Sequence, residues 1–114
     1  MMPKGIESLG VKVIHSIDEA IANNDVLNVL RIQLERKAGS SIPSLREYHN
    51  YFGVTAERIE KNNKDIVILH PGPINRGVEL SSEVADGPYQ VILDQVTNGV
   101  AIRMAVLYLL GTKN

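Results

Sequence analysis

Short segments rich in Val, Ile and Leu alternate along this chain with longer segments that begin at polar capping residues. Runs of four or five such positions between turn signals are typical of strands. The predicted strands are 11–14, 26–30 and 66–69. The predicted helical segments are 16–22, 44–52, 55–61, 81–85 and 88–111. Because strands that alternate with helices favour parallel pairing, the pattern predicts an α/β fold, a three-layer, Rossmann-like parallel sheet flanked by helices.

Two of the predicted helices begin at a serine with a matching glutamate. Ser16 precedes Glu19 by three positions, and Ser44 precedes Glu47 by three. This is the spacing of a capping box, in which the serine hydroxyl accepts from the first free backbone N–H groups. Gly53 follows the second of these helices and is expected to end it, since glycine tolerates the backbone angles at a helix end.

The last predicted helix is apolar on more than one face. Its apolar positions include Val91, Ile92, Val96, Val100, Ile102, Met104, Ala105, Val106, Leu107, Leu109 and Leu110. A helix that is apolar nearly all round is buried on most sides, and a three-stranded sheet is too narrow to cover it. We expect it to dock on another domain or to form a subunit contact. Arg103 interrupts it and is expected to meet an acidic group or a backbone carbonyl, because an unpaired buried charge is costly.

Composition excludes several classes of function. The chain has 114 residues, which is one small domain or a piece of a larger one, and 44% of them are apolar, which is enough for a core. With 12 basic and 13 acidic residues, one Phe and no Trp, we expect no nucleic-acid or membrane partner. The absence of cysteine and of histidines at ligand spacing predicts no metal site. Without a signal peptide or a membrane span, the expected location is cytoplasmic.

The most informative motif is His70-Pro71-Gly72-Pro73, which directly follows the apolar segment 66–69. In open α/β sheets, ligands bind at the carboxyl ends of the strands. Proline fixes φ and glycine removes side-chain bulk, so this sequence can hold backbone close to a ligand. An ordinary tight turn is the alternative, and the residues alone leave both open.

A second candidate site follows the segment 26–30. The guanidinium of Arg31 can bind a carboxylate through two parallel hydrogen bonds, and the amide of Gln33 can add a neutral contact. A solvated arginine at a strand end is the alternative. Glu35 and Arg36 resemble a solvated charge pair, and residues 31–43 are predicted to form a loop. Arg76 is close enough to the loop to contact an anion, but we expect its side chain to be exposed to solvent.

Taken together, the chain resembles the C-terminal part of the aspartate carbamoyltransferase catalytic chain over essentially its whole length. The matching blocks occur in order and at natural spacing. They are residues 3–7, 30–36, 44–48, 70–79, 84–87 and 95–101. The sister family, ornithine carbamoyltransferase, typically carries His-Cys-Leu-Pro at the loop. The His-Pro-Gly-Pro sequence here makes that family the less favoured interpretation.

The resemblance implies a trimer of chains with two α/β domains each, one for carbamoyl phosphate and one for L-aspartate. The aspartate amine attacks the carbamoyl carbonyl and phosphate leaves, without a metal or organic cofactor, giving N-carbamoyl-L-aspartate for pyrimidine synthesis. Regulatory or dihydroorotase chains are possible partners. The family's Ser-Thr-Arg-Thr phosphate loop does not occur in this sequence. Residues 1–114 are therefore expected to be a partial aspartate-binding domain, lacking the carbamoyl phosphate domain and inactive alone.

The resemblance also implies roles for single residues. Arg31 and Gln33 would bind L-aspartate, and Glu35 and Arg36 would belong to the loop that holds the closed arrangement of the two domains. No fixed pattern is expected for residues 37–43.

In the loop, the backbone carbonyls of Pro71 and Gly72 would accept hydrogen bonds from the carbamoyl NH₂ group. His70 and Pro73 would support the loop, and the peptide bond between Gly72 and Pro73 is expected to be cis. The alternative for the whole chain is a non-catalytic amino-acid-binding or oligomerisation module.

Overall fold

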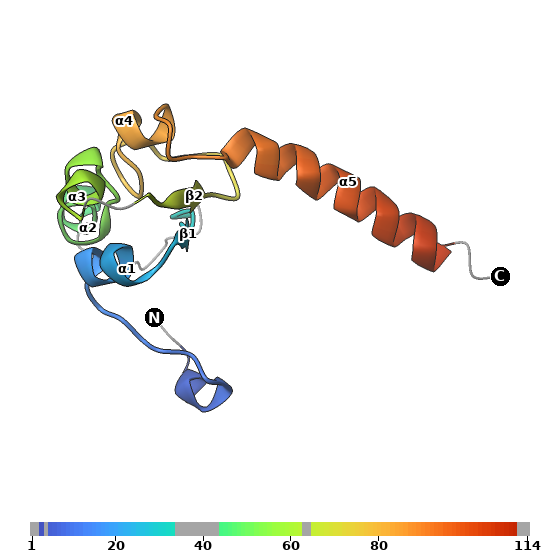
Figure 1. Cartoon of the computed structure of the whole chain (residues 1–114), viewed down its shortest axis with the longest axis horizontal. Helices are drawn as coiled ribbons and strands as arrows, with labels where there is room; N and C mark the ends of the chain where they lie inside the picture. Colours follow the sequence, from blue (N-terminus) through green and yellow to red (C-terminus); the bar gives the residue numbers. More distant parts are fainter. Residues whose placement is uncertain (1–2, 4, 34–43, 63–64, 112–114) are drawn as a thin grey trace.

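The computed structural model describes residues 3, 5–33, 44–62 and 65–111 (Figure 1). The chain order is a 3-10 helix at Ile6–Leu9, then α1 (Ile17–Asn23), β1 (Val26–Asn28), α2 (Leu45–Phe52), α3 (Ala56–Lys61), β2 (Val67–Leu69), α4 (Ser82–Ala85) and α5 (Ile92–Gly111). From α1 onwards, the strands and helices follow one another in the order that the sequence predicts.

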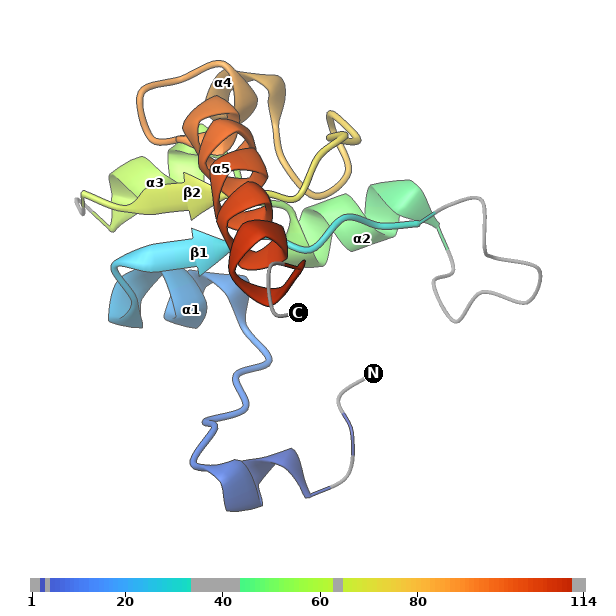
Figure 2. The same cartoon turned by 90° about the vertical axis from the view of Figure 1, so that its right-hand side faces the viewer.

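The two strands pair in parallel, with Val26 opposite Val67 and Asn28 opposite Leu69. The ladder continues past β1, because the Val29 N–H donates to the Leu69 carbonyl at 2.9 Å. Both strands therefore end at the same edge of the sheet, and the chain leaves that edge in two neighbouring segments (Figure 2). These are the segments that carry the predicted site residues.

On the other side of β2, the segment 89–91 pairs through a single bridge. The Ile68 N–H donates to the Tyr89 carbonyl at 2.8 Å, and the Val91 N–H donates to the Ile68 carbonyl at 3.1 Å. This pairing explains why α5 begins at Ile92 and not at residue 88, because residues 89–91 are extended alongside β2. The Gln90 side chain then accepts the Ile92 N–H at 2.9 Å.

The predicted strand at 11–14 is wrong. Residues 11–16 have no regular secondary structure, and among the described residues the sheet has two strands, not three. The run contains apolar side chains, of which Val13 and Ile14 are half-buried. A strand also needs a neighbour for its N–H and C=O groups, and a local pattern does not specify one.

Helix starts follow the local signals in the sequence. Ser16 and Ser44 accept the N–H groups of Glu19 and Glu47 at 3.3 and 3.0 Å, which confirms both predicted N-caps. The Gly53 N–H donates to the His49 carbonyl at the end of α2, as predicted. Each of the two serine N-caps is worth about 0.5–2 kcal/mol.

One apolar cluster holds the sheet and the short helices together. Its buried members are Ile21, Val54, Ile59, Ile66, Ile68, Leu80, Val84 and Ile92. They come from α1, α3, α4, the region of β2, the first turn of α5 and the short segments just before α3 and α4, so the core surrounds β2. Full burial of one such side chain contributes roughly 1.5–3 kcal/mol.

Helix α5 projects away from this core (Figure 1). Its 20 residues span about 30 Å at 1.5 Å per residue. Large apolar side chains beyond its first turn are exposed on several faces, for example Ile102 at 65%, Leu107 at 72% and Leu110 at 69%. Within the described part of the chain, no helix is both long enough and apolar enough to cross a membrane.

Candidate functional site

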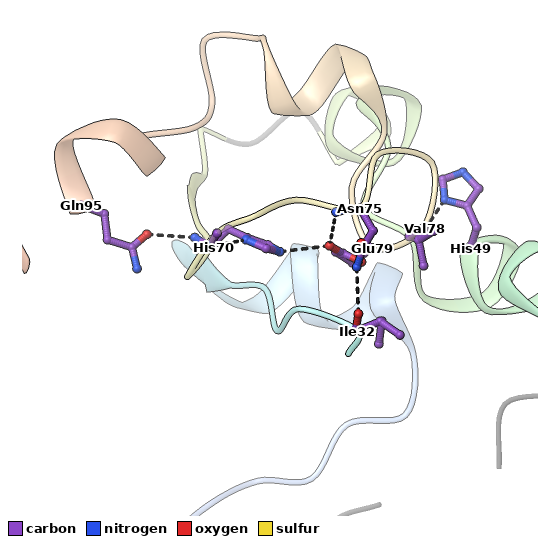
Figure 3. A network of polar contacts seen from close by, with 8 residues as sticks. Ile32, His49, His70, Asn75, Val78, Glu79 and Gln95 are labelled. Atoms are coloured by element: carbon purple, nitrogen blue, oxygen red, sulfur yellow. Dashed lines mark hydrogen bonds and ion pairs between the residues drawn. The ribbon is translucent and has the colours of Figure 1, made fainter. Parts of the chain in front are cut away.

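The segment after β1 and the loop after β2 lie side by side at the carboxyl edge of the sheet. The Asn75 side-chain amide donates to the carbonyl of Ile32 at 2.8 Å (Figure 3). Ile32 lies between Arg31, which is half-buried, and Gln33, which is exposed. The hydrogen bond thus brings the backbone of the predicted aspartate-binding residues next to the predicted carbamoyl-binding loop.

His70 is the first residue of the loop, and its side chain is completely buried. Its backbone N–H donates to Gln95 Oε1 on α5 at 2.9 Å. The Gly72 N–H donates to His70 Nδ1 at 2.9 Å, and His70 Nε2 lies 3.2 Å from Glu79 Oε1. Because Nδ1 accepts a hydrogen bond, the ring proton of the neutral imidazole must be on Nε2, which donates to Glu79.

Glu79 is also completely buried, and hydrogen bonds surround its carboxylate. Besides the His70 ring, the Asn75 N–H donates to Oε1 at 2.7 Å and Asn75 Nδ2 donates to Oε2 at 3.2 Å. A carboxylate out of contact with water is tolerated only when such donors replace its hydration. The loop 70–80 is therefore folded around one buried acidic group (Figure 3).

The turn in the loop depends on glycine. Gly72 has φ +62°, which lies in the left-handed region that side chains other than glycine rarely adopt. The Gly72–Pro73 peptide bond is cis, as the resemblance implies. Pro71 and Pro73 are exposed, so the backbone between them is accessible from outside the core.

Helix α2 covers the loop from one side. The Nδ1 atom of His49 donates to the Val78 carbonyl at 3.0 Å. Burial, with a further contribution from the negative charge of Glu79, raises the pKa of the Tyr48 hydroxyl. The charge of Glu79 thus affects the Tyr48 hydroxyl on the neighbouring helix α2.

A hollow of about 280 Å³ lies beside the loop. It is lined by His70, Pro71, Gln95, Val96, Gly99 and Arg103. Arg103 of α5 and Pro71 of the loop both line this hollow. The acidic group or backbone carbonyl expected from the sequence as the partner of Arg103 stays a prediction. The predicted loop and the first half of α5 together form a surface that neither makes alone.

Arg76 is close to the loop in sequence but is engaged elsewhere. Its guanidinium binds Asp86 through two hydrogen bonds of 2.6 and 2.8 Å on the surface. This hydrogen bonding and the positive charge lower the pKa of Asp86. Arg76 is thus an exposed arginine with a carboxylate partner from its own chain.

Three residues of the network received no role from the sequence, namely Asn75, Glu79 and Gln95. Their importance comes from burial and from partners distant in sequence, and nothing in the local pattern signals either. The predicted residues Glu35 and Arg36, and the loop 37–43, lie outside the described residues. Within the described ranges, no group of His, Asp and Glu side chains could hold a metal ion.

The fold and site define a parallel α/β domain with an accessible loop at the carboxyl ends of its strands. Residues 4–110 match the family model "Aspartate/ornithine carbamoyltransferase, Asp/Orn binding domain", and the chain belongs to this family. The resemblance found in the sequence is therefore confirmed.

Curated relatives agree with the aspartate branch of the family. The chain is 60% identical over 111 residues to the aspartate carbamoyltransferase catalytic subunit of Gemmatimonas aurantiaca, covering 97% of this chain and 35% of the relative. It is 59% identical over 111 residues to that of Cytophaga hutchinsonii, covering 97% and 36%. The chain thus spans about a third of the length of these relatives.

Solved structures have the same fold. Aspartate transcarbamoylase from Trypanosoma cruzi, in complex with carbamoyl aspartate and phosphate, matches with a TM-score of 0.69 and 28% identity, covering 94% of this chain and 35% of that one. Ornithine carbamoyltransferase from Thermus thermophilus matches with a TM-score of 0.73 over 95% and 35%, and at 23% identity this likeness concerns the fold alone.

Proposed function

We propose that this chain supplies the aspartate-binding part of an aspartate carbamoyltransferase. In that reaction the aspartate α-amine forms a bond to the carbamoyl carbon of carbamoyl phosphate. The carbon–oxygen bond to phosphate breaks, phosphate leaves, the amine loses a proton, and N-carbamoyl-L-aspartate results. Support comes from the identity of 53–60% to curated catalytic subunits. The T. cruzi relative has been solved with both carbamoyl phosphate and aspartate.

The observation that carries the proposal is the hydrogen bond between Asn75 and Ile32, which ties the two strand-end segments together. Arg31 and Gln33 flank Ile32 on one side of this contact. We assign them to the L-aspartate carboxylates, because a guanidinium binds a carboxylate through two parallel hydrogen bonds.

On the other side of this contact is the loop, in which the carbonyls of Pro71 and Gly72 would accept hydrogen bonds from the carbamoyl NH₂ group. His70 and Pro73 would keep these carbonyls in position. Acceptors that are already oriented avoid the cost of ordering them when substrate binds. The roles of Glu35 and Arg36 in domain closure rest on the resemblance alone.

We further propose that residues 1–114 are part of a larger aspartate-binding domain. Among the described residues the sheet has two short strands, fewer than the roughly four to six that are usual, and α5 exposes apolar side chains along most of its length. Both features are explained if the complete enzyme has a wider, Rossmann-like parallel sheet in three layers and covers α5 with another domain or subunit. A catalytic trimer, regulatory or dihydroorotase chains and a cytoplasmic location stay predictions.

The exposed face of α5 also favours a second candidate, a module that binds amino acids or oligomerises without catalysis. A complementation assay separates the two. The chain is purified alone and together with a carbamoyl phosphate domain from a relative, and formation of N-carbamoyl-L-aspartate is measured, with native mass spectrometry to show which chains assemble.

We expect no turnover by the chain alone and clear turnover by the assembled pair. Assembly without turnover, despite bound aspartate, would favour the non-catalytic module. Assembly with neither turnover nor aspartate binding would overturn the proposed function. The control is the same assembly made with the Arg31→Ala variant of this chain. Turnover that is unchanged in this control would not depend on Arg31.

A further inference from the structure

We propose that Glu79 is a positioning residue that acts through His70 to orient the Pro71 carbonyl. The inference rests on the proposed function, because it takes the carbamoyl NH₂ group as the partner of that carbonyl. Glu79 itself is completely buried and does not touch a substrate. Its effect would pass through the His70 ring and one peptide group.

The His70 ring links a buried charge to the loop backbone. On one side Nδ1 accepts the Gly72 N–H at 2.9 Å, and on the other Nε2 faces Glu79 at 3.2 Å. With the opposite tautomer, an N–H on Nδ1 would face the Gly72 N–H, and the Nε2 lone pair would face a carboxylate. Glu79 therefore selects the tautomer that can hold the Gly72 N–H.

Holding the Gly72 N–H also sets the direction of the Pro71 carbonyl. These two groups belong to one planar trans peptide, in which the C=O and the N–H point in opposite directions. Since the N–H points at the His70 ring, the Pro71 oxygen points away from it. The next peptide lacks this control, because Pro73 has no N–H.

A carboxylate is the side chain that suits this position. Glu79 Oε1 accepts from both the His70 ring and the Asn75 N–H, and Oε2 accepts from Asn75 Nδ2. Glutamine would bring an NH₂ group against one of these donors, whichever way its amide turned. If that NH₂ group faced Nε2, the ring proton would move to Nδ1 and the hydrogen bond to Gly72 would be lost.

The alternative is that His70 and Glu79 merely fill the core, and a matched pair of variants distinguishes the two. His70→Asn has an amide oxygen where Nδ1 lies, so it can still accept the Gly72 N–H. His70→Gln reaches towards Glu79 instead and loses the hydrogen bond to Gly72. Both remove the same buried ring, so a purely structural role predicts similar effects.

Kinetics are measured on this chain assembled with a carbamoyl phosphate domain. We expect Glu79→Gln and His70→Gln to raise the KM for carbamoyl phosphate by about 10- to 100-fold and to lower kcat, because misplacement of a binding group by about 1 Å can cost 100-fold. His70→Asn should stay within a few-fold of the wild type. Asp86→Asn removes a carboxylate from the surface near the same loop and is expected to change neither parameter.

A measurement independent of activity uses ¹⁵N spectra of the imidazole ring in the wild-type chain and in Glu79→Gln. We expect the proton of His70 on Nε2 in the wild type and a shift towards Nδ1 in the variant. The proposal is overturned if the wild-type proton lies on Nδ1, or if the two His70 variants lose carbamoyl phosphate binding equally.

Failure of this inference can be told from failure of the proposed function. If the wild-type assembly transfers no carbamoyl group, the proposed function fails and this inference with it. If the wild type is active while Glu79→Gln matches Asp86→Asn in both kinetic parameters, only the positioning role of Glu79 is overturned.

Discussion

Asn75 and Ile32 are 43 positions apart in the chain, yet the Asn75 amide donates a 2.8 Å hydrogen bond to the Ile32 carbonyl. The same amide group also donates to Glu79 Oε2 at 3.2 Å. One side chain therefore connects the segment after β1 to the buried acid that organises the loop after β2. The stability of this connection and the geometry of the candidate site should change together.

Removal of that amide should destabilise the fold. Asn75→Ala removes the amide that donates to the Ile32 carbonyl and to Glu79 Oε2. We expect a loss of about 1–3 kcal/mol in the free energy of unfolding. Asn75→Asp should lose more, because a second carboxylate would face Glu79. Urea denaturation at pH 7 measures both. Asn23→Ala, which removes an exposed local hydrogen bond, is the control, and an equal loss in all three would contradict the prediction.

The role assigned to Arg31 predicts a specific kinetic effect. In the assembled enzyme, Arg31→Ala should raise the aspartate concentration needed for half-maximal rate and lower turnover by on the order of 100-fold, as for a lost positioning contact. Arg31→Lys keeps the charge but not the two parallel hydrogen bonds, so it should remain well below the wild type. Arg46→Ala on the exposed face of α2 is the matched control. Normal kinetics for Arg31→Ala would remove this residue from the site.

The pKa of Tyr48 predicts a pH dependence of stability. Because its pKa is raised in the folded chain, the unfolded chain releases the hydroxyl proton first as the pH rises. The stabilisation is therefore fully present below the ordinary tyrosine pKa of about 10 and is lost as the pH rises from there through the folded-state pKa. We expect the urea midpoint of the wild type to fall more steeply above pH ~10 than that of Tyr48→Phe. Tyr51→Phe, which removes the hydroxyl of an exposed tyrosine on the same helix, is the control.

Two glycines should respond in opposite directions to alanine. A Cβ on Gly53 would lie 2.5 Å from His49 Nδ1 and 2.6 Å from the His49 carbonyl oxygen, and so would disturb the contact between His49 and Val78. We expect Gly53→Ala to cost about 1–3 kcal/mol. Gly99 lies inside α5 with open space around it. Gly99→Ala should therefore increase the free energy of unfolding by about 0.5–1 kcal/mol. Thermal unfolding of the two variants checks both signs, and a neutral Gly53→Ala would refute the steric argument.

The exposed face of α5 predicts self-association of the chain when it is alone. Leu107 and Leu110 are 72% and 69% exposed, and large apolar patches on a surface promote association. In sedimentation velocity, Leu107→Glu combined with Leu110→Glu should give a smaller average mass than the wild type at the same concentration. Leu9→Glu changes a leucine outside α5 that is exposed even more, at 80%, and should have little effect. A monomeric wild type would contradict this prediction.

Local chemistry explains which elements could be predicted from the sequence. The caps at Ser16 and Ser44 and the helix end at Gly53 involve atoms three or four residues apart, so the sequence pattern describes them directly. The strand predicted at 11–14 and the predicted start of α5 were wrong because these features do not depend on neighbouring residues alone. Whether an extended segment becomes a strand, or a helix starts later than its pattern, depends on hydrogen bonds to distant backbone.

The same distinction holds for the candidate site. The sequence by itself determined that Arg31, Gln33 and the His70–Pro73 loop follow apolar strands, and its motifs were enough to identify the family. The tertiary structure alone decided that Glu79 is buried beneath the loop and that Asn75 reaches Ile32. Burial and long-range hydrogen bonds depend on how the strands and helices pack, and one polar residue in a local pattern does not reveal whether packing will leave it in water or enclose it.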